Sequence, residues 1–412
     1  MSLRINTDRL LDELHTLSRI TDAEPPAVTR VLFTPRDLEA RGFLSGLFAA
    51  AGLTVRSDSI GNIFARWEGS EPALPAVATG SHTDAIPNAG MYDGTVGVLG
   101  GLEAIRALQR TGVRPRRSIE LIVFTSEEPT RFGIGCLGSR LMSGALAPLT
   151  AATLTDGDGF TLEQARRIAG CSGEIAEARL PDDHYSAFVE LHIEQGWRLE
   201  QADIPIGVVS AIAAPASLEI TLEGEGGHAG AVLMPERRDA LCGASEVVLA
   251  VEAAARQSGA IDSVATAGIC EVFPGAINSV PSRVRLKLDV RDIDAARRDG
   301  MLEKISRAVA EVSQRRGLKT SIGVLNADPP ANCSPRIIDA IEASAAEVAL
   351  PTQRMVSRAY HDSLFIARLA STGMIFIPCR GGISHRPDEH AAPEHIAAGV
   401  QVLARTLERL AS

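Results

Sequence analysis

The stretch ATGSHTDAIPNAGMYDGTVGVLGGLEAI, residues 78–105, joins two apolar segments through a short polar one. The run LPAVATGSH, which ends at His82, predicts a buried strand. TVGVLGGLEAIRALQRTG, residues 95–112, predicts a helix with one apolar face and Gly112 just past its end. Between them lie four polar or titratable side chains: Ser81, His82, Asp84 and Asp93. Either these side chains cap turns, or they hold something charged.

Outward from this stretch, helix-like and strand-like patterns alternate through the first 210 residues. Near-continuous apolar runs such as RSIELIVFTSEE (117–128) are typical of strands that helices cover on both faces. From residue 211 the strands alternate cleanly, as in a smaller module, before the first pattern returns. We therefore predict an α/β protein. Residues 1–210 and 325–412 form a discontinuous catalytic domain with a mostly parallel sheet sandwiched by helices, and residues 211–324 form an inserted, smaller α+β domain.

The composition excludes several classes of protein. The chain has 412 residues, of which 45% are hydrophobic, enough to bury at least one large core. Its formal charge of -10 argues against binding to nucleic acid or acidic membranes. No apolar run approaches the roughly 20 residues that cross a bilayer. The polar N-terminal segment does not resemble a signal peptide, and the six cysteines contain no CxxC pair, so we expect a cytoplasmic protein.

Metal-competent side chains follow four of the predicted strands. In open parallel sheets, ligands bind beyond the carboxyl ends of the strands, so these clusters are expected at one edge. They are Ser81-His82-Thr83-Asp84, Ser126-Glu127-Glu128, the segment Glu190–Glu194 with His192 at its centre, and Ser384-His385. Asp93 joins them at the start of a predicted helix.

Histidine nitrogens and carboxylates without thiolates suit zinc, manganese or a similar divalent ion. Two ions close together would share a carboxylate, for which Asp93 is the natural bridge. Asp84 can accept a hydrogen bond from the second ring nitrogen of His82 and so steady the ring. In the pair Glu127-Glu128, one carboxylate would bind metal while its neighbour stays free as a general base. Taken singly, each of these residues is more simply a helix cap or a surface polar group.

Six segments carry a resemblance to one family. They are SHTDAIPNAGMYDGTVGVLGGLEAI (81–105), SEEPTRFGIGCLGSR (126–140), ELHIEQG (190–196), GHAGAVLMPERRDAL (227–241), NSVPSRVRLKLDVRDID (278–294) and GMIFIPCRGGISHRPDE (373–389). Together they resemble the hydantoinase/carbamoylase branch of the M20-type dinuclear metallohydrolases. That branch includes N-carbamoyl-L-amino acid hydrolases, allantoate amidohydrolases and ureidoglycolate amidohydrolases.

The resemblance implies a dinuclear metal site with a separate general base. Five residues would ligate two divalent ions, with Asp93 as the bridge: His82, Asp93, Glu128, His192 and His385. Glu127 would be the general base, and Asp84 would orient His82. The ions implied are zinc or manganese, and the ligand types also admit cobalt or nickel.

The resemblance also makes the inserted domain a lid and a dimerisation surface. It implies substrate contacts from Asn278 and Arg291 in that domain and from Gln195 beside the metal ligands. A guanidinium pairs well with a substrate carboxylate. His228 would be catalytic, stabilising the oxyanion, and would reach the active site of the other subunit of a homodimer. Without the resemblance, Arg291 is better taken as a strand-surface charge and Asn278 as a turn residue.

One segment, SRAYHDS at residues 357–363, departs from the carbamoylase pattern, which usually has a small, Gly-rich stretch there. This variant is most similar to ureidoglycolate amidohydrolases. His361 and Asp362 either line the pocket or make structural hydrogen bonds. We expect hydrolysis of a linear ureido or carbamoyl C–N bond in a small carboxylate substrate. Ureidoglycolate is favoured over N-carbamoyl-L-amino acids and allantoate, and a catalytically silent metal-binding protein is the alternative from another class.

Overall fold

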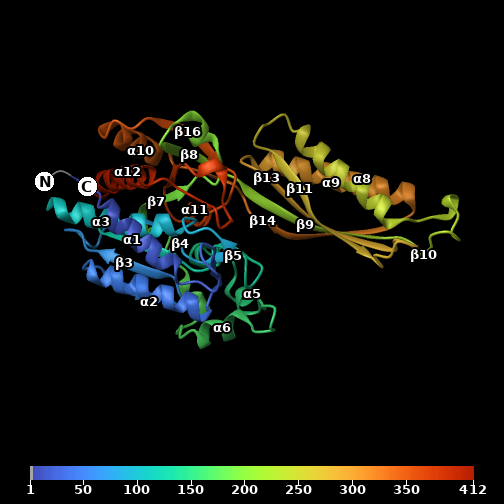
Figure 1. Ribbon diagram of the computed structural model, residues 1–412, viewed down its shortest axis with the longest axis horizontal. Helices are drawn as coiled ribbons and strands as arrows, with labels where there is room; N and C mark the ends of the chain where they lie inside the picture. The colour runs from blue at the N-terminus through green and yellow to red at the C-terminus, as the bar shows by residue number, and fades with distance from the viewer. Residues whose placement is uncertain (1–2) are drawn as a thin grey trace. The chain divides into compact units, whose positions relative to one another are not determined.

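The computed structural model describes residues 3–412, and the chain divides into two compact units (Figure 1). The larger unit comprises the residues up to Ser210 together with Cys333–Ser357 and His361–Ser412. The smaller unit comprises Ala211–Asn332 and Arg358–Tyr360. The predicted insertion, residues 211–324, would end inside strand β14 (Lys319–Ala327). That strand pairs along its whole length within the sheet of the smaller unit, so the unit continues beyond residue 324.

The larger unit is built on a mixed sheet with the strand order β8-β17-β7-β4-β6-β3-β2, and β16 pairs with β8. Its four central strands are parallel: β17 (Thr372–Ile377), β7 (Tyr185–Ile193), β4 (Ala76–His82) and β6 (Ile119–Phe124). The outer strands are β8 (Ile206–Ile212), β16 (Thr352–Ser357), β3 (Ile63–Trp67) and β2 (Thr54–Ser57). The predicted α/β class is confirmed, and the parallel strands occupy the centre of the sheet.

Helices cover both faces of this sheet. One layer, whose helices pack against one another, contains α1 (Thr7–Ser18), α3 (Thr95–Thr111), α10 (Pro335–Glu347) and α12 (Pro393–Ala411). On the opposite face, α4 (Leu137–Ser143) and α11 (Asp362–Ile366) pack together. Helix α2 (Pro35–Ala50) contacts the edge strands β2 and β3. Successive strand residues point to opposite faces. Ala78 therefore packs toward α4 and α11, and Thr79 toward α3.

The remaining short elements of the larger unit lie in its connections. They are β1 (Val28–Arg30), which pairs with β5 (Ala85–Ala89), and the helices α5 (Pro148–Ala152), α6 (Leu162–Ile168) and α7 (Arg198–Ala202). Within residues 3–412, none of the helices combines the length and the apolar character that a membrane crossing requires.

Helix α3 approaches the sheet closely because three glycines, Gly97, Gly100 and Gly101, lie on its inner side. A Cβ atom at Gly97 would stand 2.4 Å from the carbonyl oxygen of Leu191 in β7, which is too close for any other residue. This close packing brings the start of α3, and with it Asp93, next to the carboxyl ends of β4 and β7.

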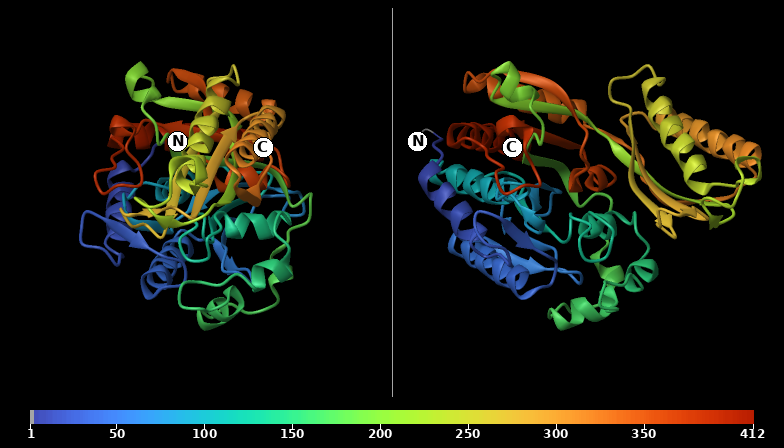
Figure 2. Two further views of the ribbon diagram at one scale, coloured as in Figure 1. Left: turned by 90° about the vertical axis from the view of Figure 1, so that its right-hand side faces the viewer. Right: turned by 45° about the vertical axis from the view of Figure 1, so that its right-hand side comes forward.

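The smaller unit is a four-stranded antiparallel sheet, with two helices packed side by side on one face (Figure 1, Figure 2). In spatial order the strands are β11 (Val264–Phe273), β13 (Arg283–Asp292), β9 (Ala214–Glu223) and β14. The helices are α8 (Ala240–Arg256) and α9 (Ala295–Arg316). A two-residue pair, β10 (Gly227–His228) with β12 (Ser279–Val280), lies beyond one end of the β9–β13 ladder, and β15 (Ala331–Asn332) pairs with the last residues of β8.

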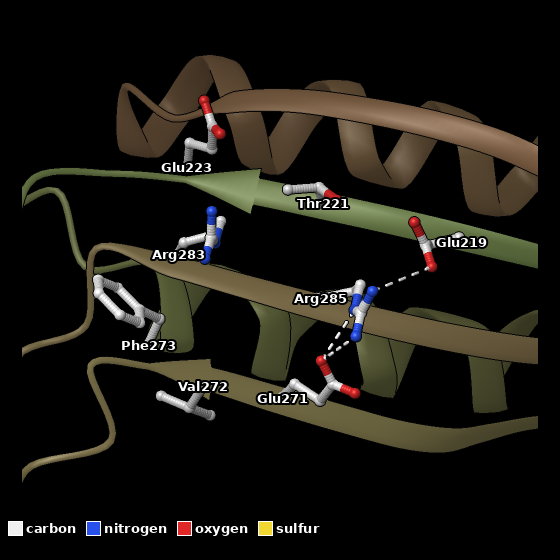
Figure 3. A pocket seen from close by; sticks show the side chains of 8 residues that line it. All are labelled: Glu219, Thr221, Glu223, Glu271, Val272, Phe273, Arg283 and Arg285. Carbon is white, nitrogen blue, oxygen red and sulfur yellow. Dashed lines mark hydrogen bonds and ion pairs between the residues drawn. The ribbon is translucent and has the colours of Figure 1, made fainter. Parts of the chain in front are cut away.

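The face of this sheet opposite the helices carries polar and charged side chains (Figure 3). A hollow of about 500 Å³ on this face is lined by Glu219, Thr221, Glu223, Glu271, Val272, Phe273, Arg283 and Arg285. The guanidinium of Arg285 donates to Glu271, and its Nη1 lies 3.9 Å from Glu219 Oε2. The charges of both signs therefore pair across the strands.

Candidate metal centre

All five predicted metal ligands belong to the larger unit and meet at the carboxyl edge of its sheet. His82 is the last residue of β4, His192 lies near the end of β7, and Glu128 follows β6. His385 comes after β17, and Asp93 directly precedes Gly94, the N-cap residue of α3. The four central strands are parallel, so their ends lie together, as the sequence predicted for these clusters.

The donor atoms form two groups that share one carboxylate. In the first, Nε2 of His82 lies 3.7 Å and Nε2 of His192 lies 3.2 Å from Asp93 Oδ1. In the second, Nε2 of His385 lies 3.2 Å from Asp93 Oδ2 and 3.3 Å from Glu128 Oε1. Asp93 thus offers a different oxygen to each group. This is the arrangement that two cations with a bridging carboxylate require.

The charges of these groups depend strongly on one another. Burial opposes ionisation of Asp93, but hydrogen bonds from His192, His385 and His82 outweigh it and hold the pKa of Asp93 well below its usual range. Burial and the charge of Asp93 raise the pKa of Glu128 to about 7. The hydrogen bond with Asp93 raises the pKa of His385 to about 9. Glu128 and His385, whose pKa values are raised, thus hold protons beside the ionised Asp93, and a bound cation would replace those protons.

Glu127 stands beside the first donor group without belonging to either. Its Oε2 lies 3.8 Å from Nε2 of His82, and its Oε1 lies 3.6 Å from the thiol of Cys136. The side chain is buried, and burial raises its pKa well above the usual range, opposed by the charge of His82. The two neighbouring glutamates therefore differ in their partners, although the charge of Glu128 also raises the pKa of Glu127.

Asp84 contacts His82 in a different way from the one we predicted. The ring nitrogen Nδ1 of His82 lies 3.0 Å from the main-chain carbonyl oxygen of Asp84, but 3.7 Å from its carboxylate. The carboxylate instead accepts hydrogen bonds from the backbone N–H groups of Glu127 (3.2 Å) and Glu128 (3.0 Å). One residue therefore steadies the imidazole through its backbone and the glutamate pair through its side chain.

Gln195, a predicted substrate contact, lies against the bridging carboxylate. Its Nε2 donates to Asp93 Oδ2 over 2.8 Å, and its backbone adopts a φ of 54°. The side-chain Oε1 is buried and has no hydrogen-bond partner among residues 3–412. Gln195 thus combines a contact to Asp93 with an acceptor oxygen that is available to a bound molecule.

His361 and Asp362 lie behind His192 and make hydrogen bonds to serines. Nε2 of His361 is 3.0 Å from Ser357 Oγ, and Ser139 donates to Asp362. Glu190, His192 and His361 form a third group of potential ligands. Both carboxylate oxygens of Glu190 already accept hydrogen bonds, from Ser81 and Ser363. These hydrogen bonds fix Glu190, and the third group therefore serves as a structural support for His192.

The other predicted contacts, His228, Asn278 and Arg291, belong to the smaller unit. His228 and Asn278 are exposed at the β10–β12 end, where Ala229 N–H donates to the Asn278 carbonyl oxygen. Arg291 lies at the opposite end of β13, where its guanidinium donates to Asp289 (2.7 and 3.1 Å) and to the carbonyl oxygen of Arg358.

The sequence argument missed Glu389, a buried carboxylate that contacts the backbone of Asp93 over 3.0 Å. It lies at the end of the GMIFIPCRGGISHRPDE segment, four residues beyond His385. Its burial in a loop rich in exposed polar residues has no signature in the sequence. Only its place within that matched segment could have drawn attention to it.

Known proteins that are similar to this chain belong to the family that the sequence segments resemble. The model of peptidase family M20/M25/M40 matches residues 78–409. The chain is 51% identical to "Ureidoglycolate hydrolase" of Arabidopsis thaliana over 416 residues, which cover 99% of this chain and 87% of that protein. It is 37% identical to "N-carbamoyl-L-amino-acid amidohydrolase" of Pseudomonas sp. (strain NS671) over 404 residues, 98% of each chain.

A solved structure is similar over the same extent. The crystal structure of AtUAH in complex with glyoxylate matches with a TM-score of 0.90 and 50% identity, covering 100% of this chain and 99% of that one. The resemblance inferred from the six sequence segments is confirmed by these matches. With its two donor groups on the fold of these relatives, the chain belongs to peptidase family M20/M25/M40.

Proposed function

We propose that this chain is a divalent-metal-dependent amidohydrolase that cleaves a linear ureido C–N bond, with ureidoglycolate as its substrate. The observation that carries the proposal is the pair of donor groups joined through Asp93, with Glu127 free beside them. The choice of substrate rests on similarity, since the chain is 51% identical to a ureidoglycolate hydrolase but 37% identical to an N-carbamoyl-L-amino-acid amidohydrolase.

The donor set fits two divalent ions. His82 and His192 would hold one ion, Glu128 and His385 the other, and Asp93 would bridge them. Imidazole and carboxylate ligands suit zinc or manganese, and also cobalt or nickel. When bound, such ions lower the pKa of a coordinated water and polarise a substrate carbonyl. Both histidines of the first group direct Nε2 toward Asp93, because Nδ1 of each lies near a backbone carbonyl oxygen.

Glu127 supplies the proton transfers in this proposal. Its carboxylate accepts a proton from the attacking water and then delivers that proton to the leaving nitrogen as the C–N bond breaks. Glu127 lies outside both donor groups, and of its two oxygens Oε1 accepts from the thiol of Cys136. Its carboxylate is therefore not committed to a metal ion in this proposal. The contacts from the Asp84 carboxylate to the N–H groups of Glu127 and Glu128 fix the two side chains relative to each other.

The remaining polar residues would hold the substrate. Arg291 is fixed by Asp289, and its guanidinium suits a carboxylate group. The amide of Asn278 would bind the substrate as a donor or an acceptor, the free Oε1 of Gln195 would accept a substrate N–H, and His228 would stabilise the developing oxyanion.

Two of these residues are too far apart to serve one site from one smaller unit. Arg291 and Arg283 are separated by eight residues of β13, roughly 26 Å at the rise of a strand. His228 lies beyond the Arg283 end, in the β10–β12 pair. We therefore propose a homodimer in which His228 serves the partner's active site. Exposed apolar side chains near His228, including Met234 (73% exposed) and Ile277 (fully exposed), would be covered in such a dimer.

Cytoplasmic residence remains part of this proposal. It is supported by the six cysteines, all of which lie in the described part of the chain and are unpaired.

A substrate panel tests the proposal. Purified protein is stripped with a chelator, reloaded with manganese or zinc, and offered ureidoglycolate, allantoate and several N-carbamoyl-L-amino acids. Metal-dependent ammonia release from ureidoglycolate, well above turnover of the other substrates, is the expected result. Release of a free amino acid from the carbamoyl substrates in preference would assign the chain to the carbamoylases. A protein that binds metal but turns over no ureido acid would be a silent binding protein.

A further inference from the structure

Glu389 is a buried carboxylate that touches the loops carrying two of the proposed metal ligands. Its Oε1 accepts hydrogen bonds from the backbone N–H groups of Tyr92 (2.8 Å) and Asp93 (3.0 Å). Its Oε2 lies 2.8 Å from the hydroxyl of Ser384, the residue before His385. Glu389 is 5% exposed, and its contacts with Tyr92 and Asp93 are buried, while the contact with Ser384 is partly buried.

The turn that presents Asp93 has no cap of its own. Helix α3 begins after Gly94. Because glycine has no side chain, this N-cap residue cannot accept hydrogen bonds from the first backbone N–H groups of the helix. Glu389, 296 residues further along the chain, supplies the acceptor for the N–H of Asp93 instead. The turn packs tightly on this side chain, because a Cβ atom at Gly90 would stand 2.3 Å from Cβ of Glu389.

Ser384 extends the contact to the ligand atoms themselves. Its hydroxyl lies 2.9 Å from Asp93 Oδ2 and 2.8 Å from Glu389 Oε2, so it joins the two carboxylates. Since Ser384 precedes His385, the same contact restrains the loop that carries His385. Glu389 therefore contacts Asp93 in two ways. It accepts from the backbone N–H of Asp93, and the hydroxyl of Ser384 links it to the carboxylate of Asp93.

We infer that Glu389 is a positioning residue that fixes Asp93 and His385 relative to each other. It thereby sets the affinity for the metal ion that Glu128 and His385 would hold. This inference rests on the proposed metal site. Residues that orient metal ligands through hydrogen bonds typically change metal affinity about 10–100-fold when they are replaced. Removal of Glu389 would also leave two buried N–H groups without their acceptor.

The test measures binding of manganese alone, without substrate. Wild type, Glu389→Ala, Glu389→Gln and the control Asp388→Ala are titrated with Mn²⁺ by calorimetry, and the loaded proteins are compared by electron paramagnetic resonance. Asp388 is an exposed acid in the same loop whose carboxylate contacts Arg386, so its loss reports general effects of charge. A pair of ions bridged by one carboxylate gives a coupled signal that isolated ions do not give.

We expect Glu389→Ala to bind one of the ions at least about tenfold more weakly and to lose the coupled signal. Glu389→Gln keeps an oxygen that accepts from both N–H groups, so it should retain most of the affinity. Asp388→Ala should match wild type. If Glu389→Ala binds two coupled ions as wild type does, the inference is wrong while the proposed function stands. If wild type binds no metal, the proposed function itself fails.

Ser384→Ala serves as a second variant, because Glu389→Ala removes a buried group and can impair folding. It breaks the link to His385 while leaving the contacts to Tyr92 and Asp93 in place. We expect it to weaken binding of the ion held by the group that contains His385, with the other ion unaffected. Unchanged affinity for both ions in a folded Ser384→Ala protein would contradict the role given to Glu389.

Discussion

Glu127 and Glu128 are adjacent in the chain, yet their carboxylates have different surroundings. Glu128 belongs to the donor group with His385 and Asp93, while Glu127 belongs to none. The segment that follows β6 can therefore supply both a metal ligand and a proton acceptor.

Replacing Glu127 by Gln should separate these two roles. The amide keeps the shape of the side chain but cannot accept the proton, so turnover should fall roughly a hundredfold or more. Metal binding should persist, since Glu127 is outside both donor groups. Steady-state assays and metal analysis of the same preparation check this. Full activity of the variant would remove Glu127 from the mechanism.

Metal binding should depend on pH through His385 and Glu128. The pKa of His385 is raised to about 9 and that of Glu128 to about 7. His385 is therefore protonated at neutral pH in the metal-free protein and must lose that proton to bind an ion. We expect Mn²⁺ affinity to rise from pH 6 to pH 9, with proton release on binding near pH 7. Calorimetry in buffers of different ionisation enthalpy measures the protons released, and binding without proton release would contradict this account.

The sequence predicted that the five proposed metal ligands meet, because strand ends in a parallel sheet lie together. It did not predict how some of them are held. The acceptor for the His82 ring is a backbone carbonyl oxygen, and the acceptor for the Asp93 N–H is Glu389. Such contacts depend on the exact path of loops, and residue types alone do not specify that path.

Among the elements, helix α3 carries the bridging carboxylate into place. Gly94, at which it begins, has a φ of 65°, and a Cβ atom there would stand 2.5 Å from Nε2 of His82. Gly112, at its other end, has a φ of 81°, and a Cβ atom there would meet no neighbouring atom within 4 Å. The two ends thus share a positive φ, but they differ in ψ (-43° at Gly94 and 2° at Gly112) and in their surroundings.

This difference makes Gly94→Ala and Gly112→Ala a matched pair. Each substitution places alanine at a positive φ, which costs about 1 kcal/mol of unfolding free energy at the left-handed Gly112. The cost at Gly94 is larger, because its ψ of -43° lies outside the left-handed region. Only Gly94→Ala also displaces His82. We expect Gly112→Ala to be mildly destabilised with full metal content, and Gly94→Ala to lose metal and activity as well. Thermal unfolding and metal analysis distinguish the two. Equal metal content in both variants would show that the contact with His82 is unimportant.

The sequence predicted the elements with a regular period best. The helix over 95–112 and the alternating strand around β13 both appear in the structure. Strand β11 was missed, because an irregularity between Ala267 and Ile269 shifts its pairing with β13. The side chains that pack on the core are Ala265 and Ala267 before this point and Val272 after it, so the alternation is interrupted.

At the scale of the whole molecule, the position of His228 far from Arg291 leads to the dimer proposal. The sequence pattern revealed an inserted module, but its second boundary was set too early. The residues between β14 and Asn332 carry no periodic signal that would mark the end of the smaller unit. The period of the hydrophobic pattern likewise does not predict whether two chains assemble. Assembly must therefore be tested by experiment.

Mixed dimers provide that test. Glu127→Gln and His228→Ala should each be nearly inactive alone. If His228 serves the partner's site, a mixed dimer contains one site with both residues intact, and random mixing restores about a quarter of wild-type activity. Co-expression with separable tags measures this. A doubly substituted chain paired with His228→Ala is the control, and no recovery in the mixed dimer would place His228 in the site of its own chain or outside the mechanism.

In the proposed function, distant segments of the larger unit bring five side chains together around two cations. An anomalous scattering map of crystals grown with manganese or zinc tests it most directly. The account predicts two peaks, one beside His82 and His192 and one beside Glu128 and His385, both in contact with Asp93. A map without peaks at these residues, from protein soaked in the ions, would contradict it.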